Sequence, residues 1–285
     1  SYGGQNATGT YSGENVLLVK YNSSGTAQWA RTVSAGANTS QFYSVATDSS
    51  GNIYAAGIQT LNGTYTYGTQ NATGTASGTN NCVIVKYDSS GTALWARTVT
   101  SGSDASSFNG VATDTSGNVY AAGTQRGVAA YTYGAPSITG TSSSNNVVLV
   151  KYDSSGTALW ARTVATGAGA NSFQAVATDA SGNIYAGGLQ SGSTTYTYGT
   201  QSATGTYASG PNILLVKYDT TGTSLWSRTV SAGTNLSTFT GISTDGSGNV
   251  YAVGHQNGNS TYTYGTQSAT GAYASSWNVL IVKYQ

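Results

Sequence analysis

Acidic turns recur along the chain, and calcium binding is the first chemistry that they suggest. Asp48, Asp114, Asp179 and Asp245 each begin a turn of the form Asp-x-x-Gly-Asn. Calcium loops gather several acidic oxygens within one turn, whereas each of these turns contains a single carboxylate. An aspartate in such a turn can instead accept hydrogen bonds from its own backbone. The pattern therefore favours turn capping, and we expect neither a metal nor a cofactor.

Catalysis would need a nucleophile with a base, a perturbed acid pair or a metal. The single histidine, His255, occupies a repeat position that is held elsewhere by Ile58, Thr124 and Leu189. The single cysteine, Cys82, occupies a position that is held elsewhere by Val16, Val147, Ile213 and Val279. Both are interpreted as tolerated strand substitutions. The sequence predicts no catalytic residue and a protein that is not an enzyme.

Tyrosine is the most promising ligand-binding residue type, because its ring can stack on a sugar and is favoured at interfaces. The chain has 22 tyrosines. Many form Tyr-x-Tyr pairs, which are the ligand candidates: Tyr65 and Tyr67, Tyr131 and Tyr133, Tyr196 and Tyr198, Tyr262 and Tyr264. Three readings stay open here, namely packing between repeats, a protein interface, and glycan binding.

The elements that must position these residues repeat with a period of about 66 residues. Lys20, Lys86, Lys151, Lys217 and Lys283 are separated by 66, 65, 66 and 66 positions. We therefore expect one domain over residues 1–285, with units at about 1–59, 60–125, 126–190 and 191–256 and a partial unit at 257–285.

Each unit contains four strand-like segments and no helical period. In the third unit these are Val147–Val150, Leu159–Val164, Phe173–Thr178 and Ile184–Gln190. Asp-Gly turns join them in pairs, which is typical of a propeller blade. Small residues in the last two segments suit a central axis, and bulky residues in the first two suit an outer edge. The predicted fold is an all-β propeller of four four-stranded repeats plus a duplicated terminal strand; a β-solenoid is the alternative.

The phrase NVLLVKYDSSGTALWARTV, followed by F..VATDASGNIYAGG, resembles the bacterial and archaeal repeat named after seven-bladed β-propellers. The Asp-x-x-Gly-Asn-x-Tyr segment is the most specific part of this resemblance. Here Asn replaces the usual Asp before the first strand, and the linker is rich in Tyr and Thr. The resemblance implies a β-propeller and an extracellular location, but it implies no particular chemistry.

Composition limits the possible partners. Charged residues make up 7% of the chain, against roughly 25% in an average soluble protein, and the net charge is +1. This balance argues against a nucleic-acid or membrane-surface partner, and no apolar run is long enough for a membrane span. Methionine is absent, even at position 1, which favours a processed protein that is secreted or displayed at the cell surface.

The last segment, Asn278–Gln285, repeats a strand phrase without the strand that follows it elsewhere. That phrase occurs five times, and the WARTV phrase and the inner hairpin occur four times each. Four complete blades would leave one such strand over, and donating it to another subunit would build a filament or layer. The two terminal copies also carry Glu14, the only glutamate, and Trp277, the only tryptophan outside the repeat. The assembly candidates are Glu14, Val16, Leu17, Leu18, Val19, Trp277, Val279, Leu280, Ile281 and Val282.

The partner predicted from these ends is another copy of the chain. Three alternatives remain open: a glycan-binding propeller that uses the Tyr-rich segments, a piece of a larger propeller, and two chains that form one eight-bladed ring.

Overall fold

The computed structural model describes residues 1–285, which form β-strands and no helix. The core of the molecule is three complete antiparallel sheets of four strands each. Sheet 1 contains β3 (Ser40–Thr47), β4 (Ile53–Thr60), β7 (Asn80–Tyr87) and β8 (Ala93–Thr98). Sheet 2 contains β9 (Ser106–Thr113), β10 (Val119–Arg126), β13 (Asn145–Tyr152) and β14 (Ala158–Arg162). Sheet 3 contains β15 (Asn171–Thr178), β16 (Ile184–Ser191), β19 (Pro211–Tyr218) and β20 (Ser224–Arg228).

Two incomplete sheets lie at the ends of the chain. The N-terminal sheet has only the two outer strands, β1 (Leu18–Tyr21) and β2 (Ala27–Arg31). Sheet 4 has the first three strands of the pattern, β21 (Ser237–Thr244), β22 (Val250–Asn257) and β25 (Trp277–Tyr284), and lacks the fourth. Each sheet thus begins with the inner hairpin of one sequence unit and ends with the outer strands of the next.

A small two-stranded hairpin accompanies each of sheets 1 to 4. The hairpins are β5 (Thr64–Tyr67) with β6 (Gln70–Thr73), β11 (Ala130–Thr132) with β12 (Ser137–Thr139), β17 (Thr195–Tyr198) with β18 (Gln201–Thr204), and β23 (Thr261–Tyr264) with β24 (Gln267–Thr270). They arise from the Tyr-x-Tyr-Gly segments, in which glycine with positive φ makes the turn, as Gly68 does at 63°.

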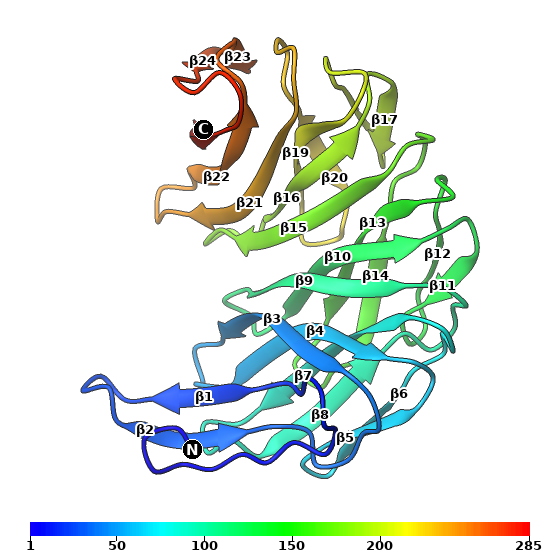
Figure 1. The fold of residues 1–285 in the computed structure, drawn as a ribbon, viewed down its shortest axis with the longest axis vertical. Coiled ribbons are helices and arrows are strands. Elements are labelled where there is room, and N and C mark those ends of the chain that lie inside the picture. The colour runs from blue at the N-terminus through cyan, green and yellow to red at the C-terminus, as the bar shows by residue number, and fades with distance from the viewer.

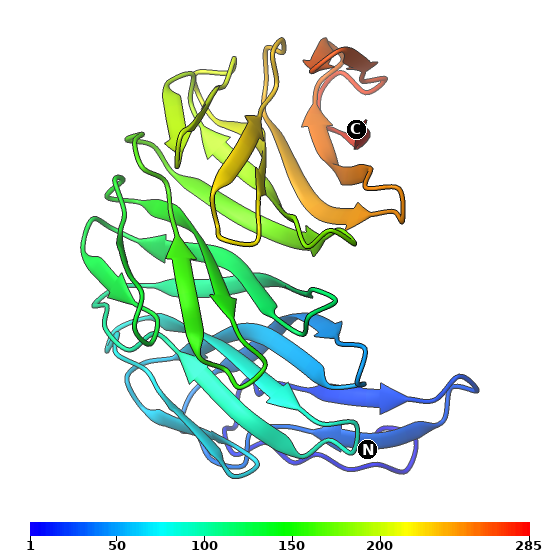
Figure 2. The same ribbon diagram turned by 180° about the vertical axis from the view of Figure 1, so that it is seen from behind.

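The sheets follow one another along an arc (Figure 1), and the view from behind shows the same open side (Figure 2). The first strands β3, β9, β15 and β21 lie along its concave edge. Threonines join them there: Thr113 Oγ1 donates to the Thr47 carbonyl at 2.9 Å, and Thr178 Oγ1 donates to the Thr113 carbonyl at 2.8 Å. The small residues of these strands permit this close approach.

The structure shows the expected all-β repeated architecture but not four complete sheets. The N-terminal sheet and sheet 4 lie at opposite ends of the arc and do not join (Figure 1). No strand is left over, because β1 pairs with β2 and β25 pairs with β22. The duplication is therefore accommodated by two open ends, which corrects the expectation of four complete blades with one unpaired strand. No helix of the structure is long and apolar enough to cross a membrane.

Candidate functional site at the two ends of the array

The acidic turns use their carboxylates internally, as capping predicts. Asp179 Oδ1 accepts hydrogen bonds from the backbone N–H groups of Ser181 and Asn183, both at 2.9 Å. Its Oδ2 accepts from the Asn183 side-chain amide at 2.7 Å and from the Tyr185 hydroxyl at 2.9 Å. The turns that begin at Asp48, Asp114 and Asp245 have the same four bonds. This set of donors explains why asparagine and tyrosine follow the glycine in each copy.

The two unique chemistry-bearing residues are packed as strand residues. Cys82 is fully buried in the core between sheets 1 and 2, and burial raises the pKa of its thiol to about 12. His255 lies on β22 and packs edge-to-face against Trp277, with ring centroids 4.1 Å apart. Partial burial lowers the pKa of His255. The one aromatic residue confined to the last repeat therefore contacts a neighbour in its own sheet.

The Tyr-x-Tyr pairs are interior residues, which corrects their assignment as ligand candidates. All eight rings are buried: Tyr65, Tyr67, Tyr131, Tyr133, Tyr196, Tyr198, Tyr262 and Tyr264. The first hydroxyl of a pair donates to a backbone carbonyl, as Tyr196 does to Ser191 at 2.7 Å. The second donates to a buried glutamine, as Tyr198 does to Gln190 Oε1 at 3.1 Å. These rings leave no free face on which a sugar could stack.

Apolar residues on both faces of the third strand of each complete sheet form its junctions with the neighbouring sheets. In β7, Cys82 and Ile84 point toward sheet 2, where they share a core cluster with Val148 and Val150. The same pattern occurs between sheets 2 and 3, where Val147 and Leu149 share a cluster with Leu214 and Val216. It occurs again between sheets 3 and 4, where Ile213 and Leu215 share a cluster with Leu280 and Val282. One face of each third strand therefore packs against the opposite face of the next.

At three of the four junctions between successive sheets, three side chains bind the turn of the following sheet. Between sheets 1 and 2, Lys86 Nζ and Trp95 Nε1 both donate to the Ser154 carbonyl, at 2.9 and 3.2 Å. Arg97 Nε donates to the Gly156 carbonyl at 2.7 Å, and its Nη2 donates to the Ser155 carbonyl at 3.3 Å. We call this lysine, tryptophan and arginine the carbonyl clamp.

The carbonyl clamp occurs with the same bonds at two other junctions. Lys20, Trp29 and Arg31 bind the turn Asp88–Gly91, and Lys151, Trp160 and Arg162 bind the turn Asp219–Gly222. Each clamp brings charged or ring N–H donors to peptide oxygens, and hydrogen bonds to charged donors are stronger than neutral ones. The recurring Lys, Trp and Arg of the sequence therefore serve the junctions between sheets.

At the C-terminal end of the array, the apolar face of the third strand and the carbonyl clamp both lack their partners. On β25, Val279 and Ile281 occupy the positions that face the next sheet, and they are 94% and 67% exposed. Their counterparts Ile213 and Leu215 are 0% exposed. The fourth clamp consists of Lys217, Trp226 and Arg228, and no turn occupies it. Arg228 donates only to the adjacent Ser227 carbonyl, at 3.0 Å.

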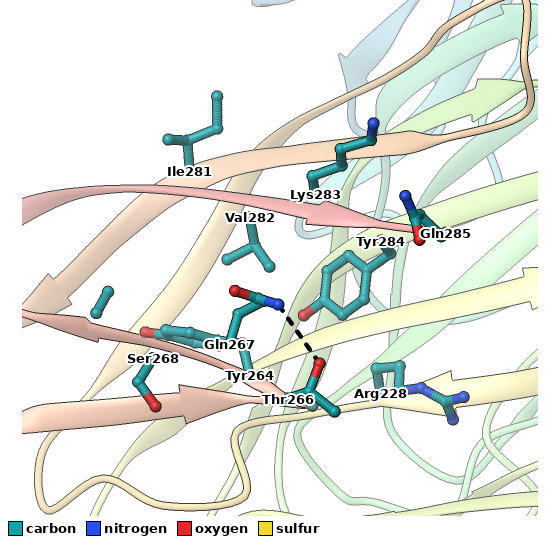
Figure 3. Close-up of a pocket in the computed structure, with 12 residues that line it drawn as sticks. Arg228, Tyr264, Thr266, Gln267, Ser268, Ile281, Val282, Lys283, Tyr284 and Gln285 are labelled. Atoms are coloured by element: carbon teal, nitrogen blue, oxygen red, sulfur yellow. Dashed lines mark hydrogen bonds between the residues drawn. The ribbon is translucent and has the colours of Figure 1, made fainter.

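A hollow of about 690 Å³ lies beside β25, lined by β24, β25 and Arg228 (Figure 3). The complete sheets have their fourth strand in this place. A Cβ added to Gly68 or Gly134 would lie 3.3 or 3.5 Å from the first residue of that strand, Ala93 or Ala158. A Cβ added to Gly265 would meet nothing within 4 Å. The hollow is thus the unfilled place of an outer strand.

The N-terminal end presents the complementary features. Leu17 is 39% exposed and Val19 is half-buried, whereas their counterparts in the complete sheets are fully buried. Tyr21 is 53% exposed, against 1% for Tyr87. The turn Asn22–Gly25 repeats the form of the turns that bind to clamps, but no clamp contacts it.

The other assembly candidates divide between the two sides of these end sheets. Val16 is buried in the core cluster between the N-terminal sheet and sheet 1, and Leu18 packs against that cluster. Leu280 and Val282 are buried against sheet 3. Glu14 accepts a hydrogen bond from the Gln41 side chain, and Trp277 is 53% exposed. Sequence reasoning found the end strands, but it missed the clamp, whose Lys, Trp and Arg are visible at fixed positions in every repeat.

Comparisons with known proteins identify no family. No family model and no curated protein matches the chain. Among solved structures, the chain is similar to the crystal structure of a protein of unknown function from Bacteroides caccae, with a TM-score of 0.40 and 11% sequence identity. That match covers 90% of this chain and 73% of the other. A likeness of this strength carries no argument about function.

Proposed function

We propose that this chain is a secreted or surface-displayed structural protein, without catalytic activity, that self-associates head-to-tail into an extracellular filament or layer. The single observation that carries the proposal is the complementarity of its ends. The C-terminal end exposes one half of an apolar junction that the chain buries four times internally, and the N-terminal end exposes the other half. A second copy of the chain therefore matches both ends.

The apolar areas at the ends are large enough to contribute to association. Burial of Val279, Ile281, Leu17 and Val19 would stabilise a contact by about 1.5–3 kcal/mol per side chain as an upper estimate. This total is of the same order as the ~4–15 kcal/mol cost of association. Because the contact joins two different surfaces and the ends lie far apart along an open arc, repeated association produces a chain of subunits instead of a closed dimer.

The repeated sheets support a β-propeller-type array in which each sheet is one blade. The resemblance to the seven-bladed propeller repeat is the basis for placing the protein outside the cell, as is the nearly uncharged composition. The uses found for Asp, Lys, Arg and Trp support a structural role, since these side chains bind the turns and junctions of the fold. Glycan binding is not proposed, because its candidate tyrosines are buried in the core.

Light scattering and negative-stain electron microscopy of the purified chain test this function. The wild type is expected to form polymers with a regular repeat at micromolar concentration. The double variant Leu17→Asp/Val19→Asp is expected to stay monomeric, because two buried charges would be unpaired at each contact. Leu159→Asp is the matched control, since Leu159 is 49% exposed on an outer strand away from both ends. A wild type that remains a monomer of 28.9 kDa at all concentrations would refute the proposal.

A further inference from the structure

One sequence segment occurs at both ends of the chain in two similar copies. Residues 1–21, SYGGQNATGTYSGENVLLVKY, correspond to residues 263–284, TYGTQSATGAYASSWNVLIVKY. In the structure the first copy leads into the β1–β2 hairpin, and the second copy forms the end of β23, then β24 and β25. The inner hairpin β21–β22 can therefore be completed by either copy, and only the first copy continues into an outer strand.

The unfilled clamp indicates which copy fits sheet 4 better. Lys217, Trp226 and Arg228 are placed to bind a turn that follows the third strand, but Arg228 donates only to the Ser227 carbonyl. The β1–β2 hairpin carries such a turn at Asn22–Gly25. The backbone of that turn already has the required form, since Gly25 has φ of 79° and Gly91, in a filled clamp, has φ of 83°. Gly25 is exposed whereas Gly91 is buried.

We propose that β24 and β25 are exchangeable, and that in the assembled state residues 5–21 and strand β2 of a second copy replace them in sheet 4. The Asn22–Gly25 turn of the second copy then binds the carbonyl clamp of Lys217, Trp226 and Arg228. This inference rests on the proposed function, because it specifies the joint through which the copies associate. The joint reproduces an internal junction of the chain, and it takes the place of a direct contact in which Val279 and Ile281 pack against Leu17 and Val19.

The register of such a composite sheet follows from the complete sheets. In sheet 1, Ile58 lies opposite Cys82 and Ala55 lies opposite Val85. By the same register, β22 residue His255 would lie opposite Val16 of the second copy. Leu17 and Val19 would then pack against sheet 3 in the places of Leu280 and Val282, and β2 would fill the hollow beside Gly265.

The exchange is favourable because equivalent interactions replace those that it breaks, whereas the interactions that it adds are new. The ladder between β22 and β25 is replaced by a ladder of the same residue types. The exchange adds the four clamp hydrogen bonds, fills the hollow, and covers Tyr21, Leu17 and Val19. It also releases a strand whose Val279 and Ile281 are exposed before the exchange. The direction is the reverse of the strand donation expected from the sequence, because β25 leaves sheet 4 instead of joining another subunit.

A disulfide that fixes β25 tests this exchange. His255 and Val279 are directly opposite in the antiparallel ladder, where Cα separations of about 4.5–5.5 Å suit a disulfide. In a Cys82→Val background, His255→Cys/Val279→Cys is expected to stay monomeric when oxidised and to assemble when reduced. The matched control is Leu189→Cys/Ile213→Cys, the same ladder position in sheet 3, which is expected to assemble in both states.

A second measurement detects the exchanged register directly. Oxidation of a mixture of two single variants, His255→Cys and Val16→Cys, is expected to give a covalent two-chain product on a non-reducing gel. Assembly of the oxidised His255→Cys/Val279→Cys protein at the wild-type level would overturn the exchange and leave head-to-tail association intact. Absence of the Val16→Cys cross-link in assembled protein would overturn it as well. If the wild type itself never assembles, the proposed function fails first.

Discussion

At the scale of single residues, the carboxylates of this protein act as hydrogen-bond acceptors for their own turns. The side-chain amide of Asn249 lowers the pKa of Asp245 to about 2, against an ordinary value of 3.8, and partial desolvation opposes this shift. Partial burial alone would raise the pKa of Asp179, but the hydrogen bonds from Asn183, Tyr185 and Ser181 outweigh it and the net shift is downward. The charged forms of Asp245 and Asp179 are therefore the forms that their folded turns prefer.

We predict acid lability from these shifts. A carboxylate with a lowered folded-state pKa stabilises the native state above its unfolded-state pKa, and this contribution is lost as the pH falls through the folded-state pKa. The thermal unfolding midpoint should thus be steady from pH 7 to about 5 and fall between about pH 4 and 2. Scanning calorimetry across this range measures it. Asp245→Asn should reduce the slope, and a midpoint independent of pH down to 2 would contradict the prediction.

The sequence predicted the role of the aspartates correctly, because one carboxylate per turn matches capping and does not match a calcium loop. It could not decide the role of the tyrosines. Aromatic rings among Asn, Gln and Thr suit a sugar site and a polar-lined core equally well. The decision depends on residues distant in sequence, such as Phe173, whose ring packs against Tyr198 with centroids 6.5 Å apart.

At the scale of strands, each inner hairpin contains a β-bulge that requires a glycine opposite it. In sheet 3 the register shifts between Phe173 and Ala175, and Gly188 lies against the bulge. A Cβ at Gly188 would lie 2.0 Å from the carbonyl oxygen of Ser172. The same close approach occurs at Gly57, Gly123 and Gly254, so the bulge is a regular part of the fold.

Gly188→Ala is expected to destabilise the protein by about 1–3 kcal/mol or more, because backbone atoms must move to admit the methyl group. Urea unfolding followed by far-ultraviolet circular dichroism measures the change. Gly246→Ala is the matched control: a Cβ there meets nothing within 4 Å and its φ is not positive, so its effect should lie within about 0.5 kcal/mol. Equal stability of the two variants would show that the bulge relaxes freely.

The strands themselves could be read from the sequence, since their apolar runs and Asp-Gly turns are strong local signals. Their grouping into sheets could not. A sequence unit and a sheet have the same length, so periodicity alone leaves the starting point of the sheet undetermined. Pairing of β4 with β7, across the intervening hairpin β5–β6, sets that starting point.

At the scale of the molecule, stability should increase from the ends of the array toward its middle. Strand β13 is covered on both faces and both edges, whereas β25 lacks an outer strand and exposes Val279 and Ile281. Backbone amides open more readily where fewer apolar contacts surround them. Closure of the array into a ring could not be predicted from the sequence, since it depends on small angles between neighbouring sheets that sum over the whole molecule.

Hydrogen exchange of the monomer measures this gradient. Amides of β25 are expected to exchange roughly tenfold or more faster than those of β13, with the Leu17→Asp/Val19→Asp variant used to keep the protein monomeric. Uniform protection from β1 to β25 would show that the ends are as stable as the centre.

The carbonyl clamp at one end and the matching turn at the other make the molecule directional. In the proposed assembly, a row of such subunits would have an acceptor terminus, where no turn binds Arg228, and a donor terminus, where no clamp binds the turn Asn22–Gly25. In the proposed assembly, growth at these two termini would involve different rearrangements and would therefore proceed at different rates. The proposed fibre would therefore have one end that grows faster than the other.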